Sequence, residues 1–221
     1  MTLSVVIPML NAAGGLAATL APLQGVDEII AVDGGSSDGS SGRAQSLGAK
    51  VIAAPRGRGG QLQVGATAAR SDWLLFLHAD TVLSQDWRAC ADAFMADPAN
   101  RDKAAVFRFA LDDDCRAARR LEAMVAWRVK WLGLPYGDQG LLIQRDLYHR
   151  LGGIKPLPLM EDVEFVRRIG AANIVVLSAV ARTSAARWRR DGWLRRSARN
   201  LACLSLYFVG VPPRVIKKLY G

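Results

Sequence analysis

Four short apolar runs dominate the first third of the chain. They read LSVVIPM, EIIAVD, KVIAA and WLLFLH, at residues 3–9, 28–33, 50–54 and 73–78. The segments between them favour helices, including one after Asn11, which we expect to cap it, and others near 40–48 and 59–70. Apolar strands that alternate with helices are typical of a parallel sheet covered on both faces. The sequence therefore predicts an α/β protein.

The second half predicts the same kinds of element in a less regular order. The pattern favours helices at 84–96, 115–132, 161–170 and 192–209, and strands at 105–111, 139–144 and 173–177. No repeat, low-complexity segment or clear linker divides the 221 residues. One domain over residues 1–221 is therefore the simplest expectation.

The charge balance favours anionic partners. Lys and Arg number 29 against 20 Asp and Glu, which gives a net charge of +9, and residues 182–199 are rich in arginine. The uncharged segment 201–213 is too short to span a bilayer. Its basic flanks leave two interpretations open, a helix that packs on the core or a helix that lies on an anionic membrane surface.

The cysteines and the N-terminal segment bear on localisation. Cys90, Cys115 and Cys203 lie far apart, so zinc-binding and iron–sulfur spacings are absent from the sequence. The uncharged N-terminal segment has no basic start and is interrupted by Pro8 and Asn11, which favours a buried strand over a signal peptide. We expect a reduced cytoplasmic protein, with possible peripheral contact at the inner membrane face.

Polar residues follow several of the predicted strands. In parallel sheets, ligands bind beyond the carboxyl ends of the strands. Asp33 ends one strand before Gly34 and Gly35, where it could either organise a turn or accept hydrogen bonds from a base or a ribose. His78 and Asp80 follow the most apolar strand, so a rigid element would hold Asp80 at a Mg²⁺ or Mn²⁺ site, with His78 as a weaker ligand.

Three further segments carry candidate chemistry. Arg56 and Arg58 lie among glycines, which suggests either a diphosphate site or an exposed loop. Leu62 breaks the G-x-G-x-x-G pattern of dinucleotide-binding enzymes. At the start of the helix at 161–170, Asp162 could be a general base, or its acidic cluster could simply complement the helix dipole. The segment 135–143 could be an acceptor-side loop or a turn.

In their order along the chain, these motifs resemble one enzyme family. The pieces VVIPMLN, VDGGSSDG, GRGGQ, FLHADT, YGDQG and MEDVEF resemble the inverting family-two glycosyltransferases of GT-A fold. The likeness covers roughly residues 3–200 and is nearest to a bacterial subgroup associated with radical-SAM gene clusters or arsenosugar biosynthesis. It implies a Rossmann-like, mixed and mostly parallel sheet with helices on both faces.

The resemblance also implies roles for individual residues. Asp162 would be the catalytic base, and Asp80, with His78, would hold the metal. The donor-binding residues would be Pro8, Asn11, Asp33, Gly35, Arg58, His78, Arg187 and Trp188. The acceptor-binding residues would be Tyr136, Asp138, Gln139 and Glu161. Three positions depart from the family pattern: His78 replaces the first acid of D-x-D, Gly34 replaces an aspartate, and no acid follows Asn11.

The sequence thus predicts a metal-assisted inverting glycosyltransferase that uses a nucleotide-diphosphate sugar, with a UDP-sugar favoured, and a hydroxyl acceptor. Residues 1–82 would form the nucleotide-sugar half, 83–200 the acceptor half and 201–221 a helical tail. A sugar nucleotidyltransferase, a non-catalytic protein that binds nucleic acid or an anionic surface, and a pseudoenzyme remain alternatives. We expect no nucleic-acid partner, and the sequence leaves the oligomeric state open.

Overall fold

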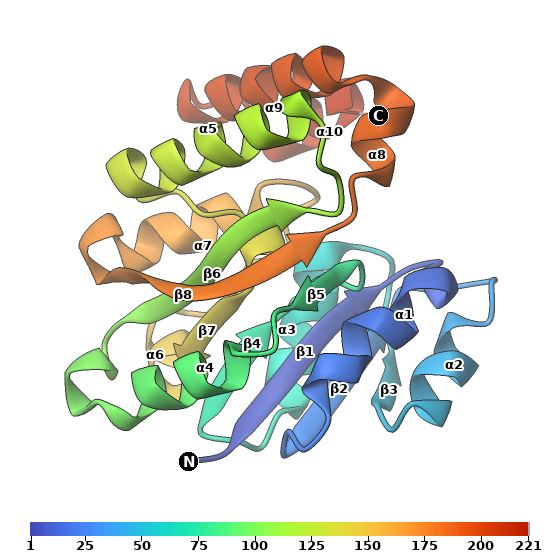
Figure 1. Cartoon of the computed structure of the whole chain (residues 1–221), viewed down its shortest axis with the longest axis vertical. Coiled ribbons are helices and arrows are strands. Elements are labelled where there is room, and N and C mark those ends of the chain that lie inside the picture. Colours follow the sequence, from blue (N-terminus) through green and yellow to red (C-terminus); the bar gives the residue numbers. More distant parts are fainter. Residues whose placement is uncertain (221) are drawn as a thin grey trace.

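A computed structural model describes residues 1–220 as a single mixed sheet with helices on both faces (Figure 1). The sheet has eight strands in the order β3-β2-β1-β4-β7-β6-β8-β5. The α/β class and the mostly parallel sheet expected from the sequence are confirmed.

The first four predicted strands form the parallel part of the sheet. They are β1 (Leu3–Met9), β2 (Glu28–Asp33), β3 (Lys50–Ala53) and β4 (Trp73–Phe76). β1 lies between β2 and β4, with Met9 opposite Asp33 and Val6 opposite Phe76. Because these strands run the same way, their carboxyl ends lie at one edge of the sheet.

The remaining strands extend the sheet beyond β4. They are β5 (Thr81–Leu83), β6 (Ala104–Leu111), β7 (Leu141–Gln144) and β8 (Ile174–Thr183). β7 is antiparallel to both β4 and β6, whereas β8 is parallel to β6 and antiparallel to β5. It follows that β8 ends, and β5 and β7 begin, at the same edge where β1, β2 and β4 end.

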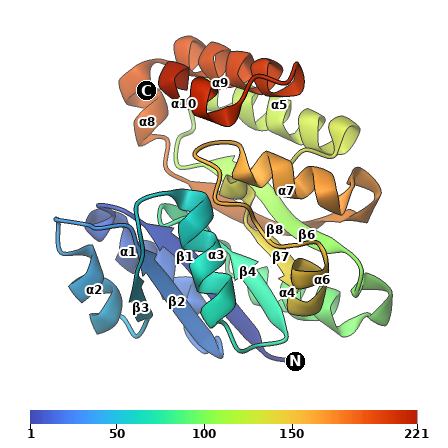
Figure 2. The same cartoon turned by 180° about the vertical axis from the view of Figure 1, so that it is seen from behind.

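Helices cover both faces and one end of the molecule. One face packs against α1 (Ala13–Leu20), α2 (Ser40–Ser46) and α4 (Trp87–Ala96), and the other against α3 (Arg58–Ala68), α6 (Arg145–Arg150) and α7 (Glu161–Ile169) (Figures 1 and 2). A further layer contains α5 (Arg116–Leu132), α8 (Ala186–Asp191), α9 (Trp193–Phe208) and α10 (Pro213–Tyr220). Both views place it at the end of the long axis opposite the N-terminus.

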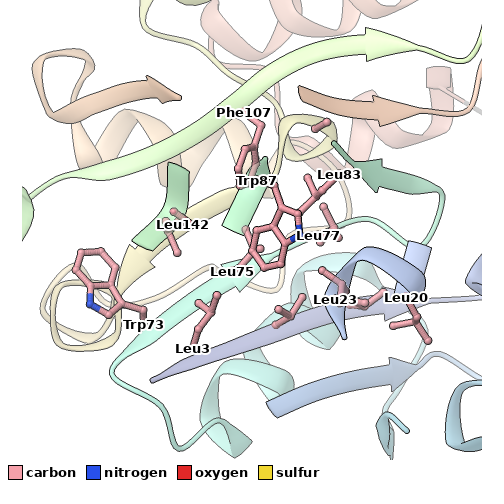
Figure 3. Packing of buried hydrophobic residues seen from close by; sticks show 14 of the residues in the cluster. Leu3, Leu20, Leu23, Trp73, Leu75, Leu77, Leu83, Trp87, Phe107 and Leu142 are labelled. Atoms are coloured by element: carbon pink, nitrogen blue, oxygen red, sulfur yellow. The ribbon is translucent and has the colours of Figure 1, made fainter. Parts of the chain in front are cut away.

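The core joins residues from both halves of the chain. Leu3 and Leu75 pack with Phe107 and Leu142 in one cluster of fully buried side chains (Figure 3). Four such side chains remove enough apolar surface from water to contribute several kcal/mol, at roughly 1.5–3 kcal/mol each. Burial of this kind ties the antiparallel strands to the parallel ones.

Helix α3 lies unusually close to β1 and β2. A Cβ atom on Gly65 would approach Val6 Cγ1 to 2.3 Å, so only glycine allows this contact. From the same helix, the buried Gln61 side chain donates hydrogen bonds to the carbonyl oxygens of Met9 and Val32, at 2.9 and 2.8 Å. These bonds fix the start of α3 against the ends of two strands.

Several expected boundaries and local roles were wrong. β4 ends at Phe76, so His78 lies beyond the strand, and α4 begins at Trp87 rather than at residue 84. Asn11 does not cap α1; its Oδ1 accepts from the Ser37 N–H at 3.0 Å, with a left-handed φ of 50°. The sequence interpretation also missed β5, α6 and α8, which are short and lack a clear period, and it placed α10 only within a helical tail at 201–221.

Candidate functional site

Two adjoining cavities open at the carboxyl-end edge of the sheet. The larger, of about 750 Å³, lies beside the ends of β1 and β4, the start of α3 and the α8 region. The smaller, of about 140 Å³, lies between α7, the 136–138 segment and the helices α8 to α10. The two cavities have one wall in common, and the residues of that wall are Arg58, His78, Asp80, Thr183, Ser184 and Arg187.

A cluster of ionic side chains lies in this wall. The Arg58 guanidinium pairs with the Glu161 carboxylate and with Asp162 Oδ2, the latter at 3.2 Å. Its Nη1 lies 3.2 Å from His78 Nε2. Glu161 has only 2% of its side chain exposed, whereas Arg58 is 37% exposed. Arg58 therefore links the segment after β4, which carries His78, to the start of α7.

Asp162 is held in its ionised form. Burial opposes its charge, but the Arg58 guanidinium and hydrogen bonds from the Gly137 and Val163 amides keep the pKa of Asp162 below its ordinary value. Gly137 N–H donates to Oδ2 at 2.9 Å and Val163 N–H donates to Oδ1 at 2.8 Å. A carboxylate offers about four lone-pair sites. Three are used, so one remains for a hydroxyl.

The backbone before α7 is strained where it presents Asp162. Met160 has a φ of 64°, which a non-glycine residue adopts at a cost of order 1 kcal/mol. This conformation turns the chain into the helix, so that Met160 and Asp162 both line the smaller cavity. Strain of this kind persists only where the surrounding structure enforces it.

His78 is neutral at physiological pH. Burial, followed by the nearby charge of Arg58, lowers the pKa of His78 to about 4. Its Nε2 atom faces an Arg58 N–H group and accepts from it. That nitrogen is therefore occupied, so the predicted role of His78 as a metal ligand stays a prediction that its other ring nitrogen would have to fulfil. His78 still lines both cavities, as expected for a residue beside the donor.

Asp80, the other predicted metal ligand, also lines both cavities. The main chain around it is fixed by β8, because Ser184 N–H donates to Asp80 O at 3.1 Å and Thr81 Oγ1 lies 2.8 Å from Thr183 Oγ1. Within residues 1–220, no group of three His, Cys, Asp or Glu side chains converges on a point that could hold a metal ion. Mg²⁺ often binds through one or two carboxylates and substrate phosphates. Asp80 fits such a shared ion and not a site built by protein alone.

The 136–138 segment forms the far side of the smaller cavity. The Arg128 guanidinium lies 3.4 Å from the centre of the Tyr136 ring, and both Tyr136 and Asp138 line the cavity. Burial, reinforced by the Asp162 charge, raises the pKa of Asp138 to about 6. Asp138 Oδ1 and Asn200 Oδ1 have no hydrogen-bond partner within the described residues. Unpaired buried oxygens of this kind suit a ligand that brings hydroxyl groups.

Of the eight predicted donor-binding residues, six line a cavity and two do not. Pro8, Asn11, Arg58, His78 and Arg187 line the larger cavity, and Trp188 lines the smaller one. Asp33 and Gly35 line neither, since the Asp33 carboxylate accepts from Ser36 and Ser41 inside its own turn. Although burial opposes its charge, these hydrogen bonds lower the pKa of Asp33.

Two of the predicted acceptor residues do not face a cavity. Gln139 is 2% exposed, and its Nε2 donates to Phe107 O at 3.0 Å. This hydrogen bond ties the 137–139 segment to β6. Glu161 is buried against Arg58 and lines neither cavity. Their burial indicates a supporting role, and direct contact of either residue with an acceptor stays a prediction.

The structure adds residues that the motifs did not reveal. Thr183, the last residue of β8, and Ser184 line both cavities, while Lys217 lines the larger and Tyr220 the smaller. Arg196 and Asn200 of α9 complete the wall of the smaller cavity. No local signal marks these residues, because they reach the site only through the folding of the C-terminal helices over it.

Part of the chain matches a known family. Residues 4–100 match the family described as Glycosyl transferase family 2. This segment contains β1 to α4, and therefore the strand ends that carry Asn11, Asp33 and Asp80.

Solved glycosyltransferases share the fold. The mannosyltransferase PcManGT from Pyrobaculum calidifontis, in complex with GDP-Man and Mn²⁺, superposes at a TM-score of 0.67 with 18% identity, over 91% of this chain and 60% of that one. Mannosyl-3-phosphoglycerate synthase from Rubrobacter xylanophilus gives 0.62 with 17% identity, over 96% and 76%. Glucosyl-3-phosphoglycerate synthase from Mycobacterium tuberculosis, with Mg²⁺ and UDP, gives 0.58 with 21% identity, over 83% and 69%.

These similarities confirm the GT-A fold expected from the sequence. At such identities they establish the fold alone, and the chain spans only 60% of the length of the mannosyltransferase.

Proposed function

We propose that the protein transfers a sugar from a nucleoside-diphosphate sugar to an acceptor hydroxyl. The observation that carries this proposal is the shared wall of two cavities, which contains Asp80 and Arg58, together with the ionised Asp162 that pairs with Arg58 and lines the smaller cavity. The family match over residues 4–100 and the GT-A fold support the same activity. The narrower radical-SAM or arsenosugar association stays a prediction.

The larger cavity suits the donor. Four exposed cations line it, Arg56, Arg182, Arg187 and Lys217, and none has a carboxylate partner among residues 1–220. Unpaired cations around a cavity favour a diphosphate. Its volume of about 750 Å³ is within the range of small-molecule sites. The smaller cavity would take the acceptor, and a UDP-sugar is the first donor to test.

The division into halves is proposed in the same terms. Residues 1–82 supply most of the donor wall, and 83–200 supply Tyr136, Asp138 and Asp162 to the acceptor cavity. The tail at 201–221 contributes Lys217 to the donor side and Tyr220 to the acceptor side.

In the proposed reaction, Asp162 accepts the proton of the acceptor hydroxyl through its remaining lone-pair site. The hydroxyl oxygen forms a bond to the anomeric carbon as the bond from that carbon to the diphosphate breaks. The pair of electrons leaves with the nucleoside diphosphate, and attack from the opposite face inverts the anomeric centre. Alignment of the two substrates across the shared wall supplies much of the acceleration.

Asp80 would hold a Mg²⁺ or Mn²⁺ ion together with the donor phosphates. Such an ion, when bound, neutralises charge on the leaving diphosphate. Arg187 and Lys217 act on the same charge from the protein side, while Arg58 is occupied mainly with Glu161 and Asp162. Since Asp80 is a single carboxylate, we expect Mn²⁺ alone to bind weakly and Mn²⁺ with a nucleoside diphosphate to bind together.

The experiment measures thermal shifts and turnover with UDP-, GDP- and dTDP-sugars, each with and without Mn²⁺. We expect one donor to raise the melting temperature, and release of a nucleoside diphosphate on addition of an acceptor. Release of pyrophosphate from a nucleoside triphosphate would instead identify a nucleotidyltransferase. If no nucleotide shifts the melting temperature, the proposed activity is wrong.

The Asp162→Asn variant tests the base. We expect it to fold and to bind the donor, because the asparagine side chain retains an oxygen for the Gly137 amide, but to lose at least about a hundredfold in kcat. Glu164→Gln is the matched control, since Glu164 lies on the same helix but pairs with Arg168 and Lys155 away from the cavities. Equal turnover of the two variants would remove Asp162 from the catalytic role.

A further inference from the structure

The end layer of helices carries most of the exposed apolar surface. Of the twelve large apolar side chains exposed in the described chain, ten belong to α5, α9, α10 or the turn between the last two. The ten are Met124, Trp127, Trp131, Leu132, Leu194, Leu201, Phe208, Val209, Val215 and Leu219. Elsewhere the surface is ordinary, so this concentration at one end requires a specific explanation.

The same layer is strongly basic. Residues 192–220 contain no aspartate or glutamate. In α5 the only acid is Glu122, whose carboxylate is 16% exposed and bonds to Leu111 N–H and Arg119. The exposed cations of α5, α9 and α10 are Arg116, Arg119, Arg120, Lys130, Arg195, Arg214, Lys217 and Lys218.

On α5 the aromatic and basic side chains alternate along one exposed stripe. Trp127 and Trp131 are four residues apart, which places them on the same face, with Met124 one turn earlier. They are 59% and 65% exposed. The Lys130 ammonium lies 5.5 Å from the centre of the Trp131 ring. The opposite face of α5, with Leu121 and Val125, packs on the molecule.

We propose that this layer, formed by α5, α9 and α10, is a docking surface for an anionic lipid bilayer. Tryptophan prefers the interface between headgroups and acyl chains, and leucines and valines gain from partial insertion. Arginine and lysine side chains extend from such a surface to lipid phosphates. Both views place the three helices at the same end of the long axis (Figures 1 and 2).

Contact of this kind is peripheral. No helix within residues 1–220 is long and apolar enough to cross a membrane. The longest helix of the layer, α5, alternates its apolar residues with arginines instead.

A bilayer fits the layer better than two other partners. In a twofold dimer through this face, the cations of one copy would meet those of the other, and α5, α9 and α10 carry no exposed acid to compensate. Nucleic acid would use the cations and the tryptophans, but exposed aliphatic residues such as Leu194 and Leu219 gain little from phosphates or bases. A lipid bilayer can contact the cations and the exposed apolar side chains at the same time.

The test is flotation of the full chain with phosphatidylcholine vesicles, with and without phosphatidylglycerol, at low and high salt. We expect binding to the anionic vesicles, weakened by salt, and quenching of tryptophan fluorescence by brominated lipid. Trp127→Ser with Trp131→Ser should weaken binding by about tenfold or more and remove most of the quenching.

Two charge variants separate this surface from the general positive charge. Arg116→Gln, Arg120→Gln and Lys130→Gln together should weaken binding by about a hundredfold. The matched control, Arg43→Gln, Arg70→Gln and Arg101→Gln, removes three exposed cations outside the layer and should bind as the native protein does. Circular dichroism and melting temperature confirm that each variant is folded.

Several outcomes would overturn the proposal. They are the absence of vesicle binding, an equal loss in the control variant, a native dimer that dissociates when the tryptophans are replaced, or duplex binding that depends on the same side chains in place of vesicle binding. Since vesicle binding is measured without donor or acceptor, the result is independent of the proposed transferase activity.

Discussion

Gly137 lies between the His78 imidazole and the Asp162 carboxylate, where a side chain would have too little room. A Cβ atom there would lie 2.8 Å from His78 Nε2 and 3.4 Å from Asp162 Oδ2. The close approach lets the Gly137 amide donate to Asp162. A glycine is therefore needed at this position for space and not for an unusual backbone angle.

We expect Gly137→Ala to lower turnover by at least about tenfold, because His78 and Asp162 must move apart, while stability falls by only about 1 kcal/mol. Steady-state kinetics and urea denaturation measure the two effects. Gly42→Ala is the control: the position lies in α2 with no atom within 4 Å of the added Cβ, so activity should not change. A fully active Gly137→Ala variant would contradict the proposed geometry.

Asp138 predicts a pH-dependent stability. Burial raises the pKa of Asp138 to about 6 in the folded state, against about 3.9 when unfolded, so between these values the folded state binds more protons. This carboxyl group therefore makes the protein less stable as pH rises from about 4 to above 6. Besides burial, neighbouring charges act on the pKa of Asp138: Arg128 and Arg58 lower it, and Asp162 and Asp80 raise it.

Asp138→Asn removes this ionisation. We expect the variant to gain about 3 kcal/mol over the native protein above pH 7 and nothing near pH 4. Urea denaturation at a series of pH values gives the difference directly. A difference that does not change with pH would show that Asp138 titrates normally in the folded protein.

At the scale of single residues, the sequence located Arg58, His78, Asp80 and Asp162 at the site. Each of them follows a strand or begins a helix beside a glycine or an acidic cluster, which is a local signal. It could not reveal that Arg58 occupies His78 Nε2, because that contact joins residues 20 apart through the packing of α3. The metal role of His78 therefore stays a prediction that concerns its other ring nitrogen.

Among the elements, α10 connects the end layer to both cavities. Ile216 is fully buried beneath it, while Lys217 and Tyr220 line the larger and the smaller cavity. The exposed Lys218 belongs to the same helix and lines neither. The two adjacent lysines therefore have different surroundings.

We expect Lys217→Ala to weaken nucleoside-diphosphate binding by about fivefold to tenfold, since a charge-assisted contact with a phosphate is lost. Lys218→Ala, which removes the same charge next to it, should leave the dissociation constant unchanged. Isothermal titration with UDP and Mn²⁺ measures both. If the two variants bind alike, α10 does not contribute to the donor cavity.

The elements also show where periodicity is informative. The long apolar strand β1 and the amphipathic helix α5 were predicted within one residue of their observed bounds. The three-residue β5 was missed because it forms only by pairing with β8, with Thr81 opposite Thr183. A strand that short has no period of its own.

For the whole molecule, one sheet spans the proposed halves. β4 pairs with β7, which places Trp73 opposite Gln144 and Phe76 opposite Leu141. Residues 4–100, which match the glycosyltransferase family, contain β4 but lack β7 and β6. Taken alone, this segment would leave β4 unpaired on one side and expose the surface that Phe107 and Leu142 cover.

We expect the full chain to unfold in a single transition, because the halves share a sheet and a core. Far-ultraviolet circular dichroism and tryptophan fluorescence should give the same midpoint in urea. A fragment of residues 1–100 should lack cooperative unfolding. Two separate transitions in the full chain would show that the halves are independent domains.

The sequence by itself determined the α/β class, the parallel strands β1 to β4 and the strand ends that carry most of the site. These follow from local hydrophobic periodicity and from the rule that parallel strands present their carboxyl ends together. Only the tertiary structure decided which side chains can reach a ligand. It buries Glu161 and Gln139, places Arg58 against Nε2 of His78, and brings Lys217 and Tyr220 to the cavities. Such contacts depend on distant segments packing together, and no local pattern in a chain encodes them.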